Sequence, residues 1–233
     1  MMKEMLTNRI LTGLSAAEFA RLMPSLEPVS LSAGEQLAGL GEEQPFVYFP
    51  ESSVITCHAD MQDGRSVEVG MIGKEGLAGL TALVGARPAA QSMKVAIAGS
   101  ALRVRSDGFE RELRGAEALR QALLQYAVEY CAQVSQRGAC AVLHRMEQRL
   151  AVWLLLLSDR LGADEIQITH ERMAQHLGVR RAGVTEAACE FKHQGLISYT
   201  RGNLRVLDRR ALEAVACECY GALNLTVLRP SFA

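Results

Sequence analysis

The first half of the chain alternates short apolar runs with turn residues, a pattern typical of β-strands. The runs rich in Val, Ile, Tyr and Phe are predicted as strands: Pro28–Leu31, Gln36–Ala38, Phe46–Phe49, Val54–His58, Ser66–Ile72 and Met93–Val104. Asp63-Gly64 stands between two of them and is a strong signal for a tight turn. Many short strands at this spacing predict a β-barrel or a jelly-roll sandwich.

A helical pattern replaces the strand pattern after Asp107, which can cap a helix. From Ala116 to Arg137 there is no proline or glycine, and apolar or aromatic side chains recur every three or four residues. This stripe consists of Leu119, Leu123, Tyr126, Tyr130 and Val134. It occupies one helix face, which either packs against the chain's own barrel or forms a seam with a second copy. Gly138 is predicted to end this helix, and a second helix is predicted from Cys140 to Leu161.

The region after Gly162 predicts a helix-turn-helix. Thr169 is a good N-cap for a short helix from His170 to Leu177. Gly178 supplies the positive φ of a tight turn, and a second helix is predicted from about Arg180 to His193. In such a unit the second helix lies in the major groove of DNA.

The residues predicted to contact DNA lie at the start of the first helix, on the second helix and on the hairpin that follows it. They are Thr169, Arg180, Arg181, Ala182, Thr185, Glu186 and Arg201. Arg can bond guanine, Thr a base or a phosphate, and Glu can accept from cytosine. Two predicted strands, Leu196–Tyr199 and Asn203–Leu207, form a wing, with Arg201 at its tip to meet phosphate or a minor groove.

Charge supports this interpretation. The whole chain has a net charge of −1, but between Arg172 and Arg210 eight basic residues face three acidic ones, a local excess of +5. A basic patch on a nearly neutral chain fits one module that meets phosphate. A solvated helical face would show the same charge, so the hairpin and the helix spacing decide between the two.

Other chemistry is disfavoured. The cysteines form no C-x-x-C pair and no zinc-finger spacing with histidine, and Cys217 and Cys219 would point to different faces of a helix. We therefore predict no metal site. We also predict no catalytic site, because the sequence shows no phosphate-binding Gly-rich loop and no nucleophile with its base. No run is long enough to span a bilayer and the N-terminus lacks an export signal, so a cytoplasmic location is expected.

The order of elements resembles the Crp/Fnr superfamily of bacterial transcription regulators, from about Leu14 to Tyr220. The residues that show the resemblance are Ile168-Thr169-His170-Glu171, Ala174-Gln175-His176-Leu177-Gly178-Val179, Arg181-x-x-Val184-Thr185 and Gly195-Leu196-Ile197. The resemblance implies that the β half is a jelly roll of the cyclic-nucleotide-binding type and the long helix a dimer interface. It also implies that Arg181 contacts a base.

Two departures concern ligands. Cyclic-nucleotide binders of the family carry Gly-Glu and later Arg-Ser or Arg-Thr around the cyclic phosphate, whereas this chain has Glu75-Gly76 and Gln91-Ser92. The candidate ligand pocket is Gly76, Gly79, Arg87, Gln91 and Ser92, with Arg87 or Lys94 as substitute cations. We expect no cofactor, and we expect cyclic AMP to bind weakly or not at all. The iron–sulfur branch of the family uses an N-terminal cysteine cluster, and no cysteine precedes Cys57.

The expected fold is α+β: a β jelly roll over residues 1–115, a dimerisation helix over 116–138 and a winged helix-turn-helix over 139–233. The expected function is that of a dimeric, sequence-specific transcription regulator controlled by an unidentified signal at the β-roll. The alternatives are a true cyclic-nucleotide receptor with an unusual phosphate clamp, and a cupin-like enzyme, which a single His58 in the β half disfavours. The expected partners are double-stranded DNA and a second copy, with RNA polymerase as a further candidate and no membrane.

Overall fold

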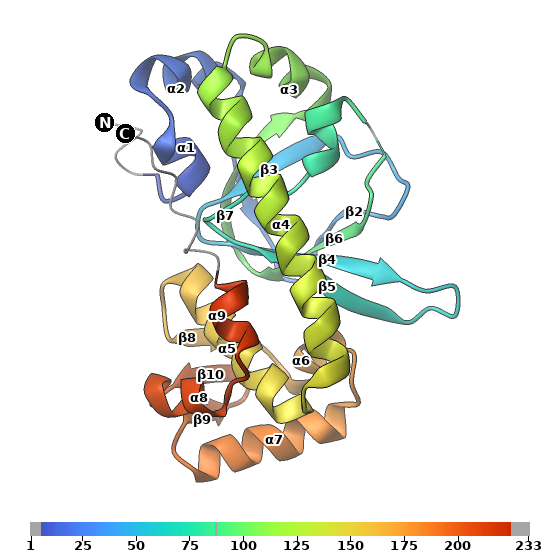
Figure 1. The fold of residues 1–233 in the computed structure, drawn as a ribbon, viewed down its shortest axis with the longest axis vertical. Helices are drawn as coiled ribbons and strands as arrows, with labels where there is room; N and C mark the ends of the chain where they lie inside the picture. Colours follow the sequence, from blue (N-terminus) through green and yellow to red (C-terminus); the bar gives the residue numbers. More distant parts are fainter. Residues whose placement is uncertain (1–5, 87, 225–233) are drawn as a thin grey trace. The chain divides into compact units, whose positions relative to one another are not determined.

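The computed structural model describes residues 6–86 and 88–224 (Figure 1). Contacts divide these residues into two compact units. The first unit comprises the described residues up to 65 together with residues 71–128, and the second comprises residues 66–70 and those from 129 onward. No described helix is long and apolar enough to cross a membrane.

Two sheets form the β part, as the alternating pattern predicted. Their strands are β1 (Glu27–Leu31), β2 (Gln36–Ala38), β3 (Phe46–Pro50), β4 (Val54–Asp60), β5 (Ser66–Ile72), β6 (Ser92–Ile97) and β7 (Gly99–Arg105). One sheet has the order β1-β7-β3 and the other β2-β6-β4-β5. Sequence neighbours β6 and β7 therefore lie in different sheets, which is the arrangement of a β-roll.

The prediction of a single strand from Met93 to Val104 was wrong. The chain leaves one sheet after Ile97 and enters the other at Gly99. A Cβ at Gly99 would stand 2.5 Å from the backbone of Ser52 and Ser53, so only glycine fits where the two chain segments pass. A strand pattern alone does not show a change of sheet, because both halves keep the alternation of period two.

Short helices flank the sheets of the first unit. They are α1 (Arg9–Gly13), α2 (Ala16–Leu22), the 3-10 turns η2 (Met23–Ser25) and η3 (Leu80–Val84), and α3 (Ser106–Leu113). Helix α2 begins with a capping box between Ser15 and Glu18, a signal that the sequence analysis missed. Helix α3 begins one residue before Asp107, which lies in its first turn and pairs with Arg105 at 3.1 Å instead of capping it.

Helix α4 (Glu117–Leu143) is longer than predicted, because Gly138 does not end it. A Cβ at Gly138 would meet no atom within 4 Å, so this glycine lies on an open helix surface. A glycine there costs about 1 kcal/mol in helix propensity and leaves the hydrogen bonds intact. The helix ends at Leu143, and Arg145 is the N-cap of the next one.

The stripe predicted as the dimer seam is buried inside the chain. Leu119, Leu123, Tyr126 and Tyr130 are 0–7% exposed. The ring of Tyr126 lies over Gly76, and the ring of Tyr130 lies over Gly70. Of the two interpretations left open, packing against the own chain is therefore the correct one for these four residues. Val134 is half-buried and faces the same way.

The remaining elements build the second unit. They are α5 (Met146–Leu161), β8 (Glu165–Gln167), α6 (His170–Leu177), α7 (Arg181–His193), β9 (Ile197–Thr200), β10 (Asn203–Val206), α8 (Arg209–Val215) and α9 (Cys219–Leu223). The strands form a small sheet with the order β8-β10-β9. The middle of α5 is buried without a break from Leu150 to Ser158, and α6, α7, α8 and α9 pack against this helix.

Candidate nucleic-acid interface

Helices α6 and α7 form the predicted helix-turn-helix. The hydroxyl of Thr169 accepts a hydrogen bond from the backbone N–H of Arg172 at 3.3 Å and so caps α6. Gly178 has φ +64° and ends α6 in the left-handed conformation. The pair of helices packs through buried small residues, Ala174 on α6 and Ala187 and Ala188 on α7. The predicted boundary of the second helix is right to within one residue.

The first turn of α7 presents the predicted base-contacting side chains. Arg180 is the N-cap, and Arg180, Arg181, Ala182 and Glu186 are exposed. Among the described residues, no carboxylate pairs with Arg180 or Arg181. Two guanidinium groups without a carboxylate partner, at the exposed start of a helix, are available for phosphate or a guanine edge.

Thr185 differs from its neighbours because it is half-buried and its hydroxyl is already engaged. It donates to the carbonyl of Arg181 at 3.0 Å and lies 3.0 Å from Nδ1 of His170. The ring of His170 in turn stacks on Tyr199 of the wing, with 4.3 Å between the centroids. Burial, and next the charge of Arg181, lower the pKa of His170. In the sequence, His170 stood out only as the start of the first helix and as part of the family resemblance, and this role was not predicted.

The wing is a two-residue hairpin. Thr200 pairs with Asn203, so Arg201 and Gly202 alone form the turn. Their φ values are +47° and +88°, which is the conformation of a type I′ turn and matches the twist of the strands. Arg201 is exposed at this tip, as predicted, and is the one described non-glycine residue with positive φ.

A buried carboxylate anchors α6. Glu68 accepts hydrogen bonds from Trp153 of α5 at 3.2 Å and pairs with His176 of α6 at 2.8 Å and with Arg137 of α4. Although burial raises its pKa, Arg137 and His176 together lower the pKa of Glu68 to about 2. The ring of His176 also stacks on Trp153 at 5.1 Å. This cluster could not be predicted from the sequence, because its members are far apart along the chain.

The space beside the glycines of the predicted ligand pocket is filled by the chain's own side chains. A Cβ at Gly76 would stand 2.2 Å from the ring of Tyr126, and one at Gly79 would stand 2.3 Å from the amide of Gln44. Ser92 is buried, accepts from the backbone N–H of Leu40 at 3.1 Å and donates to Asp60. Gln91 is half-buried, and Arg87 lies outside the described residues.

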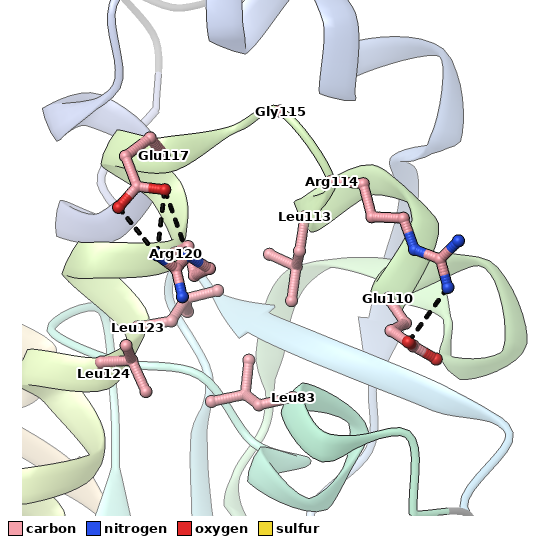
Figure 2. A pocket seen from close by; sticks show the side chains of 9 residues that line it. All are labelled: Leu83, Glu110, Leu113, Arg114, Gly115, Glu117, Arg120, Leu123 and Leu124. Carbon is pink, nitrogen blue, oxygen red and sulfur yellow. Dashed lines mark hydrogen bonds and ion pairs between the residues drawn. The ribbon is translucent and has the colours of Figure 1, made fainter.

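The first unit does contain a pocket of about 340 Å³ elsewhere (Figure 2). Leucines of η3, α3 and α4 give it an apolar wall, and two ion pairs lie at it: Arg120 with Glu117 at 2.9 Å and Arg114 with Glu110 at 3.3 Å. None of the predicted ligand residues lines this pocket, which is formed by Leu83, Glu110, Leu113, Arg114, Gly115, Glu117, Arg120, Leu123 and Leu124.

Comparison with known proteins agrees with this geometry. Residues 148–215 match the Crp-like helix-turn-helix domain. The chain is 23% identical over 210 residues to the CRP-like cAMP-activated global transcriptional regulator of Mycobacterium tuberculosis, covering 87% of this chain and 94% of the relative.

Solved structures share the fold. FixK2 from Bradyrhizobium japonicum has a TM-score of 0.70 at 16% identity, over 82% of this chain and 98% of that one. A Crp/Fnr-family transcriptional regulator from Eubacterium rectale has a TM-score of 0.66 at 16% identity, over 90% and 98% of the two chains. A β-roll followed by a winged helix-turn-helix defines a DNA-binding transcription regulator. Residues 148–215 are thus a Crp-like helix-turn-helix domain, and the fold of the chain is that of the Crp/Fnr regulators, as the sequence predicted.

Proposed function

We propose that this regulator binds a two-fold related DNA site as a homodimer and reads its sequence with α7. The observation that supports this most directly is the exposed, carboxylate-free first turn of α7, with Arg180, Arg181 and Ala182, beside a wing tip at Arg201. In winged helix-turn-helix proteins the start of the second helix meets base edges in the major groove. Thr169 and Glu186 are proposed to make further contacts with DNA. Thr185 is proposed to act on DNA binding only indirectly, through its contact with His170.

A second face of α4 supports the dimer. On one side of this helix, exposed residues repeat with spacings of four, three, four, three and four: Leu124, Val128, Cys131, Ser135, Gly138 and Val142. Val128 and Val142 are 68% and 83% exposed, which is unusual for valine in the absence of a partner. This heptad spacing is that of a coiled-coil seam, and the small residues in its middle allow close approach of a second α4. We call these six residues the α4 seam.

The seam replaces the stripe of Leu119, Leu123, Tyr126, Tyr130 and Val134 as the proposed dimer contact. The occupant is a second copy of the same helix in parallel, because a two-fold axis along α4 presents two α7 helices to two half-sites. Selection of bound duplexes from a random pool tests the proposal. We expect an inverted repeat, with two chains per duplex in sedimentation analysis. Selection of a single asymmetric half-site by one chain would contradict it.

We further propose that the signal acts at the pocket of Figure 2 and not at the predicted ligand residues. Leu124 belongs both to the wall of this pocket and to the α4 seam, so an occupant of the pocket changes the packing of the seam. Leu83→Trp, which fills the pocket from η3, is expected to change the dimer dissociation constant. An unchanged constant in a folded Leu83→Trp protein would separate the pocket from the seam.

A cyclic nucleotide is the less favoured signal. The M. tuberculosis relative is described as cAMP-activated. In this chain, however, Tyr126 lies against Gly76, and Gln91 supplies no cation for a cyclic phosphate. Calorimetric titration with cyclic AMP is expected to show no micromolar binding to the wild-type protein. Micromolar binding that Gln91→Leu abolishes would favour the receptor alternative instead.

A further inference from the structure

A cluster of four potential metal ligands lies in the second unit, on residues outside the helix-turn-helix and the wing. We propose that Cys140, His144, Cys217 and Cys219 bind one Zn²⁺ ion. The inference does not depend on the proposed function, since it concerns the stability of the unit and not the contacts with DNA. It contradicts the expectation from the sequence that the chain has no metal site.

The geometry of the four ligand atoms fits a single tetrahedral ion. All of them lie within 4.8 Å of one another. The Sγ atoms of Cys140 and Cys217 are 3.6 Å apart, and Sγ of Cys219 is 3.6 Å from Nδ1 of His144. With Zn–S and Zn–N bonds of about 2.3 and 2.0 Å, a tetrahedron has S–S and S–N edges of roughly 3.8 and 3.5 Å. A disulfide would instead require a separation of about 2.0 Å between two of the sulfurs.

The surroundings orient the ligands as in known zinc sites. Nε2 of His144 lies 3.2 Å from a carboxylate oxygen of Glu218, which directs the proton to Nε2 and leaves the Nδ1 lone pair facing the sulfurs. The amide of Gln136 donates to Sγ of Cys219 at 3.1 Å. Such a donor stabilises the negative charge that remains when three thiolates and one Zn²⁺ come together.

Burial indicates a closed, structural site. The three cysteines are 0–5% exposed, and the His144 side chain is 17% exposed. With four protein ligands no position is left for water or substrate, so the site has the composition of a structural Cys₃His centre. Binding releases the three thiol protons to solvent, and His144 enters as the neutral ring.

Cys217 and Cys219 were not predicted as metal ligands, for a reason that the structure removes. Cys217 and Cys219 were expected on one helix, where residues two apart diverge. Cys217 instead lies in the turn between α8 and α9, and Cys219 is the first residue of α9. Cys140 lies in the last turn of α4, and His144 directly follows the helix. The backbone N–H of His144 still donates to the carbonyl of Cys140 at 3.1 Å, so this i, i+4 pair keeps the helical spacing that places both on one side. One ion would fasten the end of α4 to the start of α9.

The experiment measures metal on the full-length protein, purified without air and under reducing conditions. Elemental analysis is expected to find one zinc per chain, and metal-free protein titrated with Co²⁺ is expected to develop the visible absorption of a tetrahedral thiolate site. Cys140→Ser and Cys219→Ser should each lose the metal. Cys189→Ser is the matched control, because Cys189 is an exposed cysteine on α7, outside the cluster, and should keep it.

The titration of the wild-type protein decides even if a variant fails to fold. Chelation should lower the melting temperature of the wild type and of Cys189→Ser, and zinc should restore it. Reduced wild-type protein that binds neither Zn²⁺ nor Co²⁺ would overturn the proposal. So would a Cys140–Cys217 disulfide in protein prepared without air, or a double Cys140→Ser, Cys219→Ser variant that retains a full equivalent of metal.

Discussion

The ring of His170 lies stacked on the ring of Tyr199, with 4.3 Å between their centroids. The same imidazole reaches the hydroxyl of Thr185, which donates to the carbonyl of Arg181. The side chain of His170 therefore connects α6, the start of α7 and the wing. Since both parts that are proposed to contact DNA meet at this ring, its protonation is expected to affect them together.

Replacement of His170 by Asn keeps a hydrogen-bonding atom near Thr185 and removes the stacked ring. We expect a loss of about 0.5–1.5 kcal/mol from the aromatic contact. The wild type should also lose stability as the pH falls below about 6.5, because the lowered pKa means that the unfolded chain binds the proton first.

Urea unfolding above and below this pH, followed by the fluorescence of Trp153, measures both effects, because Trp153 is the single tryptophan of the chain. His193→Asn is the control, since His193 is exposed at the end of α7. An equal pH dependence in His170→Asn and the wild type would show that His170 does not titrate in this range.

Glu68 provides a second prediction, in which stability is also lost on acidification but at a lower pH. Glu68→Gln leaves the partly buried guanidinium of Arg137 without its carboxylate and should cost about 3–5 kcal/mol. Because the pKa of Glu68 is lowered from 4.5 to about 2, its contribution is complete above pH 4.5 and is lost as the pH falls towards 2. Glu165→Gln is the matched control, since Glu165 pairs loosely with Arg205 at 3.8 Å on the surface and should change stability little. Similar urea midpoints for the two variants would mean that the buried charge is compensated in another way.

Arg181 and Arg201 should differ in how they bind DNA. Arg181→Ala is expected to cost about 1–3 kcal/mol on the preferred site and to relax preference at one base pair per half-site. Arg201→Ala should weaken binding to all sequences alike and lower the slope of log affinity against log salt by about one per half-site. Salt titrations on the selected site and on scrambled DNA separate the two. Equal losses of Arg181→Ala on both DNAs would remove it from the base-reading surface.

Two faces of α4 should respond differently to charge. Val128 is 68% exposed in the protomer, so the Val128→Glu variant should fold normally and sediment as a monomer. Leu123→Glu, at a position with no exposure, should instead destabilise the protomer itself. Circular dichroism and sedimentation equilibrium measure the two outcomes. A folded Val128→Glu protein that remains dimeric would exclude the α4 seam.

The helix and strand bounds of the winged helix-turn-helix were predictable from the sequence to within a residue or two, because its signals are local. Thr169 caps a helix, Gly178 turns it, and Arg201-Gly202 closes a hairpin, each through bonds to near neighbours. Strands β2 and β5 were also predicted with their observed bounds.

Features that depend on distant partners were not predictable. The apolar stripe from Leu119 to Tyr130 has the same spacing whether a sheet or a second helix covers it, and only the fold shows which. Glu68 meets Arg137 and Trp153 across more than sixty residues of chain. Gly138 looked like a helix end because glycine is a weak helix former, yet the flanking residues keep the helix continuous.

The left-handed backbone conformation of Arg201 destabilises the wing tip, whereas its side chain is proposed to contact DNA. A side chain at φ +47° costs about 1–2 kcal/mol that glycine would avoid. Arg201→Gly should therefore raise the melting temperature of the protein while weakening its affinity for DNA, whereas Arg201→Ala should weaken affinity without that gain. Thermal unfolding and DNA titration of the two variants check this, and a lower melting temperature for Arg201→Gly would show that the turn is unstrained. Arg at this position thus lowers the stability of the protein and raises its affinity for DNA, so selection for heat resistance and selection for tight DNA binding would favour different residues here.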